Sequence, residues 1–570
     1  MDSALHIGSR YLQARSGVCE SVYTLKFDQN IFSDNFSSLF SSLFSSVSFG
    51  HQNLPSRAVT MQVEQISEVH LEKILSELED YQISHASLLK IPRSLADFDS
   101  TVAVARPIGV SIVPTAFPRL LFYHALDIQT LFNELYIRIS EDDTWLETII
   151  ESLGEVDGLA AKLWSIWERV RDEGEIQKLR CGIFRSDYML HYDCPGIGGK
   201  ETITDDHILQ CLRGSELKQV EFNTYSCAGG VHANIVANMH RYLASKSIHK
   251  APYLPTNNAI RSIVKALEGA HREYGSPVDP NRHTAILMTV QPNNVNICDE
   301  RPIEYALSEC EPPIVLYRAE FSDEITQKCS LGPSRELLFR PNLESKVIEI
   351  SIVYQRAGYD LHEYDRQGID ARCMLERSRA IKCPTILSHL AGLKKVQQEL
   401  TTPGILERFI APEMVALLRR TFVPQYPFGI SMEGIQAQAQ EIALDKQKAE
   451  NYILKPSLEG GGHNVYGEDI PDFLKTVPKQ EWSKYVLMER IHPPLVHGVL
   501  ISPIDTHRGV VVSELGVLGT CLWRRNERRG EKVEIISNNR AGWTFKTKPE
   551  DVQEMSVVKG YGCFDCPSLL

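Results

Sequence analysis

The stretch Tyr452-Ile-Leu-Lys-Pro-Ser-Leu-Glu-Gly-Gly-Gly-His-Asn-Val-Tyr466 joins a short apolar run to a lysine, a carboxylate and three consecutive glycines. The apolar run predicts a strand that leads into a glycine-rich loop. Glycines allow backbone N–H groups to approach phosphate oxygens, Lys455 can neutralise a phosphate, and Glu459 can hold Mg²⁺. The stretch matches neither the Walker A pattern nor the dinucleotide-binding pattern. Because a run of glycines is more often a flexible loop, a phosphate site needs support from elsewhere in the chain.

The segment Val220-Glu-Phe-Asn-Thr-Tyr-Ser226 provides such support. Side chains alternate along a strand, so Glu221 and Asn223 are expected on the same face. Two oxygen ligands on one rigid edge suit a hard cation that bridges phosphate groups. Taken alone, the pattern is more often a solvated strand edge. Beside the glycine-rich stretch, it favours a nucleotide site.

Two further segments each place an arginine at a strand end or turn. They are Cys181-Gly-Ile-Phe-Arg-Ser-Asp-Tyr-Met189 and Tyr354-Gln-Arg-Ala-Gly-Tyr359. The planar guanidinium of an arginine binds a carboxylate through two parallel hydrogen bonds, which a peptide substrate with several carboxylates requires. A single arginine is usually a surface ion-pair partner, so Arg185 and Arg356 gain meaning only from the other motifs.

The composition is that of a globular protein with an acidic balance. The chain has 570 residues, is 43% hydrophobic and carries a formal net charge of -13 at pH 7. This charge argues against nucleic acid or an anionic membrane as the main partner. The 13 cysteines are irregularly spaced, which is typical of reduced thiols in a cytoplasmic protein. We find no apolar run near the ~18 residues of a transmembrane helix and no signal-peptide pattern.

Residues 1–64 differ from the rest of the chain. Their segment 36–49 repeats phenylalanine, leucine and paired serines, so we expect a low-complexity N-terminal extension. Its apolar positions also follow helical spacing, and an amphipathic helix remains an alternative. Beyond it, amphipathic helices are expected from Val63 and at 118–150, 155–175, 230–246, 257–274, 300–310, 366–381, 385–400 and 412–422. Strands are expected at 284–290, 347–354, 452–454 and 509–513, which together with the helices indicates a layered α/β fold.

Four more motifs complete the pattern: Ala391–Leu400, Tyr485–Ile491, Ser513–Gly516 and Phe545–Lys548. In their order and spacing, the motifs resemble the eukaryotic glutathione synthetase family of the ATP-grasp fold, across about residues 65–570. The resemblance implies a mixed α/β main body formed by residues 65–282, 393–426 and 510–570. It also implies a parallel-sheet substrate-binding domain at 283–392 and a lid at 427–509 that carries the glycine-rich loop.

The resemblance implies an activity as well as a fold. Members of this family are ligases that use ATP as co-substrate and join γ-glutamylcysteine to glycine through an acyl phosphate, giving glutathione. The family further implies about two Mg²⁺ ions per active site, a cytoplasmic location and a homodimer. Nucleic acid and a transmembrane segment have no place in this interpretation.

The family's functional residues carry over onto matching positions of this sequence. The residues expected in catalysis are Arg185, Lys455 and Glu459, and those expected to bind metal are Glu221, Asn223 and Glu459. The residues expected around ATP are Met189, Glu221, Lys394, Lys455, Asn464, Tyr466, Met488, Glu489, Ile491, Glu514 and Lys548. The residues expected around the substrates are Arg185, Ser226, Asn294, Asn296, Glu300, Arg356, Tyr359, Lys546, Val557 and Val558.

The sequence departs from the family pattern at several of these places. The glycine-rich loop carries Ser457, Leu458 and His463 where the family has Gln, Arg and Asn. Glu300 stands in place of a glutamine, Lys546 in place of an arginine, and Met555–Lys559 in place of a loop rich in alanine and glycine. Two alternatives therefore stay open. One is a related ligase with a different amine acceptor, and the other is a non-catalytic, effector-like protein that retains the scaffold.

Overall fold

The computed structural model describes residues 68–91, 104–154, 157–193, 205–248, 253–342, 344–457, 463–503, 505–526 and 533–570. All of them belong to one compact unit that spans residues 56–570. The expected extension at 1–64 and the predicted metal ligand Glu459 lie outside the described residues. Within the described part of the chain, no helix is both long and apolar enough to cross a membrane.

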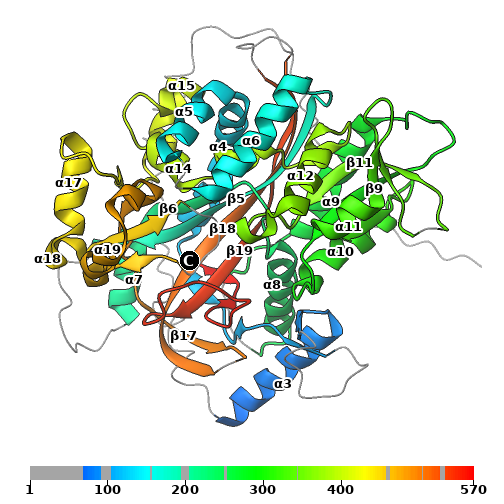
Figure 1. The fold of residues 1–570 in the computed structure, drawn as a ribbon. Helices are drawn as coiled ribbons and strands as arrows, with labels where there is room; N and C mark the ends of the chain where they lie inside the picture. The colour runs from blue at the N-terminus through cyan, green and yellow to red at the C-terminus, as the bar shows by residue number, and fades with distance from the viewer. Residues whose placement is uncertain are drawn as a thin grey trace, which may run out of the picture. The chain divides into compact units, whose positions relative to one another are not determined.

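The chain forms a mixed α/β fold (Figure 1). The helices are α3 (Glu68–Ser84), α4 (Arg119–Glu141), α5 (Asp143–Leu153), α6 (Gly158–Glu173), α7 (Asp205–Gly214), α8 (Gly230–Ser245), α9 (Ala259–Tyr274), α10 (Ile297–Ser308), α11 (Asp323–Lys328), α12 (Arg366–Arg377), α13 (Ile386–Ala391), α14 (Lys394–Leu400), α15 (Leu406–Phe409), α16 (Pro412–Arg419), α17 (Gly434–Ala443), α18 (Lys446–Ala449) and α19 (Ile470–Thr476). The strands of the large sheet are β3 (Val110–Ser111), β5 (Leu179–His191), β6 (Glu216–Asn223), β7 (Thr284–Val290), β8 (Leu316–Glu320), β9 (Cys329–Leu331), β10 (Leu337–Phe339), β11 (Ile348–Gln355), β12 (Ile381–Cys383), β17 (Val496–Ile501), β18 (Thr506–Arg524), β19 (Glu534–Pro549) and β20 (Cys563–Phe564). Two separate pairs of strands are β1 (Leu88–Lys90) with β2 (Ala105–Pro107) and β4 (Thr115–Phe117) with β21 (Pro567–Leu569).

The large sheet has 13 strands in the order β17-β3-β20-β19-β18-β5-β12-β11-β10-β9, with β6 beside β5 and β7 between β11 and β8. Its centre consists of the long antiparallel strands β5, β18 and β19, which run side by side in Figure 1. Strand β18 alone has 19 residues, and it pairs with β5 along Glu514–Arg524. Strand β18 therefore runs without interruption through regions of the protein that differ in polarity.

The two faces of these central strands bury different cores, because successive side chains point to opposite sides. On β5, Phe184 and Tyr188 join a core that includes helix α4, whereas Cys181 and Ile183 join a core that includes helix α9. On the same face as Cys181 and Ile183, the next alternate positions of β5 are polar. One face of the strand thus changes from an apolar core to a polar surface along its length.

Helices α4 and α5 were expected as one helix over 118–150, but the structure separates them at Asp142. The Asp142 side chain accepts a hydrogen bond from the Trp145 backbone N–H at 3.0 Å, so it caps α5. Similarly, the helix expected over 385–400 divides into α13 and α14 around Gly392. In both places the apolar periodicity continues across the break, which explains why the pattern suggested one long helix.

Strands β8, β7, β11 and β12 form a parallel part of the large sheet, within the range expected for a parallel-sheet domain. Strand β7 is a nearly continuous apolar run, as expected for a strand that is buried on both faces. Strands β8 and β12 also contain the charged residues Arg318, Glu320 and Lys382. Helices α10, α11 and α12 lie in the connections between them. Strand β7 has the expected bounds, and β11 differs from expectation by one residue at each end.

A second, antiparallel sheet has the order β13 (Gln425–Pro427), β16 (Tyr485–Glu489), β14 (Tyr452–Pro456) and β15 (Val465–Tyr466). Its core contains Leu454, Leu487 and Trp482, together with apolar residues of α17, α18 and α19. The strand expected at 452–454 is β14, and it leads into the glycine-rich segment. Strand β17 lies within the range expected for the lid, but it pairs with β18 of the large sheet.

Candidate active site

A pocket of about 1090 Å³ is lined by residues of both sheets. The large sheet contributes side chains of β5, β6, β18 and β19, and the small sheet contributes side chains of β14, β15 and β16. Every residue expected around ATP lines this pocket: Met189, Glu221, Lys394, Lys455, Asn464, Tyr466, Met488, Glu489, Ile491, Glu514 and Lys548. Arg185 and Lys546 from the expected substrate set line it as well. The quoted motifs other than Tyr354–Tyr359, which are far apart in sequence, therefore converge on one cavity.

Strand register places the polar side chains of the large sheet in neighbouring rows. Arg185 lies opposite Asn223, and Asp187 lies opposite Glu221 on β6 and Gly516 on β18. These are the polar positions that follow the apolar face of β5. The expectation that Glu221 and Asn223 share a face is confirmed, because the Asn223 Nδ2 donates to Glu221 Oε1 at 3.2 Å.

Two lysines surround the Glu221 carboxylate. Lys394 begins α14, and its Nζ lies 3.7 Å from Glu221 Oε2. Burial alone would raise the pKa of Glu221, but Lys394 and Lys455 outweigh burial and lower it to about 2. Burial lowers the pKa of the Lys455 ammonium to about 8, against the opposing effect of Glu221. A phosphate bound beside Lys455 would favour its charged form and offset this burial.

A second acid–base pair lies on the central strands. Glu514 on β18 and Lys546 on β19 are direct neighbours in register, and their Oε1 and Nζ atoms are 2.5 Å apart. Burial raises the pKa of Glu514 in spite of the Lys546 charge. Further along β19, Lys548 Nζ donates to the Val552 carbonyl oxygen. Lys546 is thus engaged with a carboxylate of the protein itself.

The segment after β19 joins the pocket to the small sheet. The Tyr466 hydroxyl donates to the Gln553 carbonyl oxygen at 3.4 Å and lies 3.4 Å from Glu554 Oε1. The Asn464 Nδ2 lies 3.5 Å from the same Glu554 oxygen. Met555 and Lys559 also line the pocket, whereas Val557 is buried and Val558 is exposed without lining it.

Sequence reasoning missed several side chains of this pocket, above all Asp187 and Glu554. Asp187 stands within the quoted motif two residues after Arg185, so alternation along a strand could have placed it beside the arginine. Glu554 had no comparable signal, because it lies in an irregular segment. The pocket is also lined by Tyr192, Asp193, His207, Cys211 and His492, which no motif indicated.

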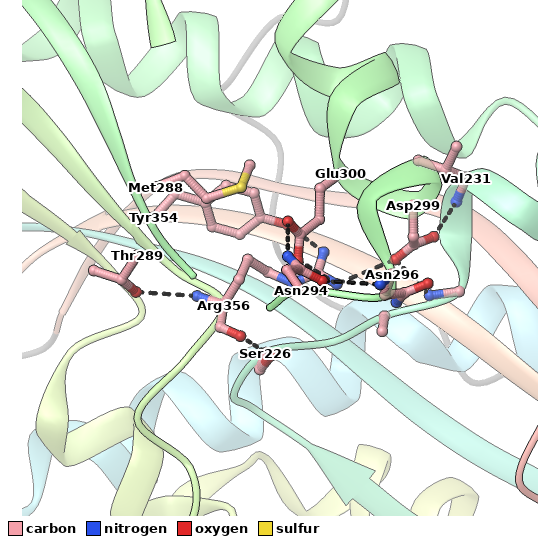
Figure 2. Close-up of polar contacts among 12 residues, drawn as sticks. Ser226, Val231, Met288, Thr289, Asn294, Asn296, Asp299, Glu300, Tyr354 and Arg356 are labelled. Atoms are coloured by element: carbon pink, nitrogen blue, oxygen red, sulfur yellow. Dashed lines mark hydrogen bonds and ion pairs between the residues drawn. The ribbon is translucent and has the colours of Figure 1, made fainter. Parts of the chain in front are cut away.

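A separate polar cluster contains most of the remaining predicted substrate residues (Figure 2). The buried Arg356 Nη2 donates to Asp299 Oδ2 at 3.1 Å, and the Ser226 hydroxyl donates to the Arg356 carbonyl oxygen at 3.1 Å. The Arg356 Nε atom has no hydrogen-bond partner among the described residues. None of the side chains in this cluster lines the large pocket.

Glu300 and the two predicted asparagines complete the cluster. Arg318 Nη2 and Asn294 Nδ2 both donate to Glu300 Oε2, at 2.5 and 2.6 Å. The Asn294 Oδ1 atom accepts from the Asn296 backbone N–H at 2.9 Å. Tyr359 lies beyond the end of β11 in the same region, and its backbone N–H donates to Glu363. The cluster therefore balances two arginines against two carboxylates, Asp299 and Glu300.

The loop of residues 224–229 connects the pocket and the cluster. Arg185 Nη1 donates to the Ala228 carbonyl oxygen at 3.0 Å, and the Gly229 backbone N–H donates to Asp299 Oδ2 at 2.9 Å. Ser226 in the same loop contacts Arg356 and has a positive φ of 48°. The loop thus contacts a predicted catalytic arginine on one side and the buried cluster on the other.

The donors at the pocket fit Mg²⁺, which prefers hard oxygen ligands. The Asn223 amide nitrogen faces Asp187 and Glu221, so its carbonyl oxygen is turned away from both carboxylates. Within the described residues, no three His, Cys, Asp or Glu side chains group as a metal site. The predicted set includes an amide and Glu459, which is outside the described residues.

A large mixed sheet and a small antiparallel sheet that together line one pocket of lysines and carboxylates define a protein of the ATP-grasp class. Residues 68–569 match the family model described as eukaryotic glutathione synthase, ATP binding domain. The chain belongs to this family.

Relatives in other organisms align with most of the chain. The glutathione synthetase large chain of Schizosaccharomyces pombe is 30% identical over 522 residues, which cover 88% of this chain and 98% of the relative. The human glutathione synthetase is 33% identical over 463 residues, which cover 80% and 89% of the two chains. A solved structure of a glutathione synthetase like-effector from Globodera pallida has a TM-score of 0.66 at 20% identity and covers 90% of this chain and all of that chain. That likeness shows the shared fold.

Proposed function

We propose that this chain uses ATP to join γ-glutamylcysteine to glycine and so forms glutathione. One observation carries the proposal: the pocket lined by every residue expected around ATP is connected through Arg185 and the loop 224–229 to the buried Arg356 cluster. A nucleotide site beside a carboxylate-binding site is the arrangement that this reaction needs. The effector-like alternative is not favoured, since relatives named glutathione synthetase are 30% and 33% identical over most of the chain.

In the proposed reaction, the γ-phosphoryl group of ATP passes to the cysteinyl carboxylate and forms an acyl phosphate. The amine of glycine then attacks the acyl carbon, and phosphate leaves. Catalysis of this kind depends on positioning and on the stabilisation of charge spread over phosphoryl oxygens. Lys394 and Lys455 supply positive charge from two different elements, and Arg185 supplies a third cation at the side of the pocket nearest the loop 224–229.

Mg²⁺ bound with ATP would neutralise phosphoryl charge. We propose Glu221, Asn223 and Glu459 as its protein ligands, with two ions in each active site. The position of the first two supports this assignment, because Glu221 and Asn223 lie on one face of β6 with their side chains in contact and Glu221 lines the pocket; binding of both to one ion would require the Asn223 carbonyl oxygen to turn toward Glu221.

The Arg356 cluster is the proposed site for γ-glutamylcysteine. The buried Arg356 Nε atom lacks a hydrogen-bond partner among the described residues, and a buried guanidinium N–H of this kind favours a bound carboxylate. Ser226, Asn294, Asn296, Glu300 and Tyr359 are proposed to contribute to the same site. Lys546, Val557 and Val558 are proposed on the acceptor side, where the segment after β19 approaches the pocket.

The small sheet with helices α17–α19 is the proposed lid over ATP, and the parallel strands β7, β8, β11 and β12 form the proposed substrate-binding domain. Residues 1–64 are proposed as a low-complexity extension. We further propose a cytoplasmic homodimer. Size-exclusion chromatography with light scattering should give twice the chain mass of 64.4 kDa, and a mass of one chain would refute the dimer.

The reaction is tested by mass spectrometry of products. Purified protein receives ATP, Mg²⁺, γ-glutamylcysteine and an equimolar mixture of amino acids that includes glycine. The proposal expects glutathione as the main product and phosphate release only when the dipeptide is present. A different condensation product would indicate another acceptor, and no product with an intact fold would refute the ligase activity.

A further inference from the structure

Asp187 joins two side chains that the proposed reaction uses, although no motif assigns it a role. Its Oδ1 accepts from Arg185 Nε at 2.6 Å, and its Oδ2 accepts from Arg185 Nη2 at 2.7 Å. The same Oδ2 accepts from Asn223 Nδ2 at 3.1 Å. The Asp187 side chain is only 2% exposed, so its carboxylate is held by these contacts and does not move among alternative contacts with solvent.

These contacts decide which atoms face a ligand. A guanidinium has five N–H donors. Asp187 takes two of those of Arg185, and the Ala228 carbonyl oxygen takes a third, which leaves two among the described residues. Burial on its own would lower the pKa of Arg185, but the Asp187 carboxylate outweighs burial and raises it. Arg185 is therefore a fixed, permanently charged donor, because a bidentate pair constrains both position and rotation.

Gly516 on β18 makes room for this arrangement. A Cβ atom built on Gly516 would overlap the Thr544 hydroxyl and would lie 2.6 Å from Asp187 Oδ1 and 3.0 Å from Arg185 Cδ. Real Cβ atoms essentially never approach other heavy atoms this closely. The ion pair thus passes directly over the backbone of the neighbouring strand, at the register position where β18 has no side chain.

We propose that Asp187 is a positioning residue that holds Arg185 and Asn223 in one fixed geometry. The lack of a side chain at Gly516 leaves the space that this geometry requires. This inference rests on the proposed function, in which Arg185 meets an anionic substrate group and Asn223 meets Mg²⁺. Both carboxylate oxygens of Asp187 accept from these two side chains, so Asp187 acts through them. Its effect is to keep the cation and the amide oxygen at a constant separation, so that both engage their ligands in the same bound state.

The sharpest test changes Gly516 rather than a charged group. Gly516→Ala keeps every ionisable residue of the pocket but pushes on the Asp187 carboxylate. The matched control is Gly519→Ala on the same strand, where an added Cβ would press on the buried Asn133 amide with its Cγ at 2.7 Å, away from the pocket. Both variants stress β18, but only Gly516→Ala displaces the Asp187 pair.

We expect Gly516→Ala to lower kcat by about 10²-fold, the loss typical of a 1 Å misplacement, with the KM for ATP changed less than about twofold. Gly519→Ala should lose thermal stability to a similar extent while it keeps kcat. If Gly516→Ala does not fold, Asp187→Asn decides, because it removes the charge and retains the shape. It should lower kcat by a comparable factor and raise the Mg²⁺ concentration for half-maximal activity.

Each outcome has one meaning. Equal kcat values for folded Gly516→Ala and Gly519→Ala would overturn the positioning role, as would wild-type kcat and Mg²⁺ dependence in Asp187→Asn. If the wild-type protein forms no glutathione, the proposed function itself fails. In that case, ATP binding to the protein measured at increasing Mg²⁺ concentrations still tests whether Asp187 positions Asn223. Equal Mg²⁺ dependence of ATP binding in wild-type protein and Asp187→Asn would refute that role.

Discussion

Asp299 offers a quantitative test of the buried cluster. Its carboxylate accepts from the backbone N–H groups of Gly229 and Val231 at 2.9 and 3.1 Å, and from Arg356 Nη2 at 3.1 Å. It therefore caps the first turn of α8 and pairs with a cation that is itself only 3% exposed. Asp299→Ala would leave the Arg356 charge and two backbone donors in the interior. Breaking a buried pair in this way costs about 3–5 kcal/mol in the free energy of unfolding.

The measurement is urea denaturation followed by tryptophan fluorescence. Asp299→Asn retains one acceptor oxygen and should lose about 1.5–3 kcal/mol, the typical worth of a hydrogen bond to a charged group. The control is Asp127→Ala, which breaks an exposed ion pair with Arg540 of 2.8 Å and should lose at most about 1 kcal/mol. In addition, Asp299→Asn should raise the KM for γ-glutamylcysteine more than the KM for ATP, because Arg356 does not line the nucleotide pocket. A cost for Asp299→Ala no larger than for Asp127→Ala would refute this reasoning.

Three further predictions address other charges. Glu459→Gln should lower kcat by about 10²-fold or more in a normally folded protein, and wild-type turnover would contradict a metal role. Lys546→Met should lower stability by about 3 kcal/mol, because it leaves buried Glu514 without its cation, whereas Lys546→Arg should stay near wild type in the same urea titration. Burial lowers the pKa of Lys382 from 10.5 to about 8. Between these values only the unfolded chain binds the proton, so stability should rise with pH there, by at most about 1.4 kcal/mol per pH unit. Lys382→Met should show a smaller rise when urea midpoints are compared across that pH range, while the buried Lys455, whose pKa is also about 8, still contributes to it.

The sequence predicted the parallel strands β7 and β11 well, did not indicate β8 and β12, and predicted the long central strand poorly. Strand β7 has its expected bounds, since an apolar run between turn signals has a single simple interpretation. Strand β18 was expected over 509–513 but spans Thr506–Arg524. In the sequence alone, the glycines at 516 and 519 indicate the end of a strand. In the structure they accommodate Asp187 and Asn133, which come from distant parts of the chain.

The residues of the site were likewise predicted in part and missed in part. Alternation was sufficient to place Glu221 and Asn223 together, and the resemblance to the family led to the residues of the ATP pocket. Asp187 was missed because a carboxylate near an arginine in sequence is usually an exposed ion pair. Its burial depends on the pairing of β5 with β18, which no local pattern encodes. Roles for the individual site residues remain predictions that the experiments above address.

The continuity of β18 also determines where this chain can tolerate insertions and deletions. Glu514 lines the pocket and Gly516 lies against Asp187 and Arg185, while Leu515 and Val517, the alternate positions, belong to the apolar core. One residue gained or lost in this part of the strand would exchange the two sets, so a carboxylate would enter the core and leucine would enter the pocket. Length variation among relatives should therefore be confined to connections such as the one between β18 and β19, and the span from Glu514 to Leu518 should keep constant length.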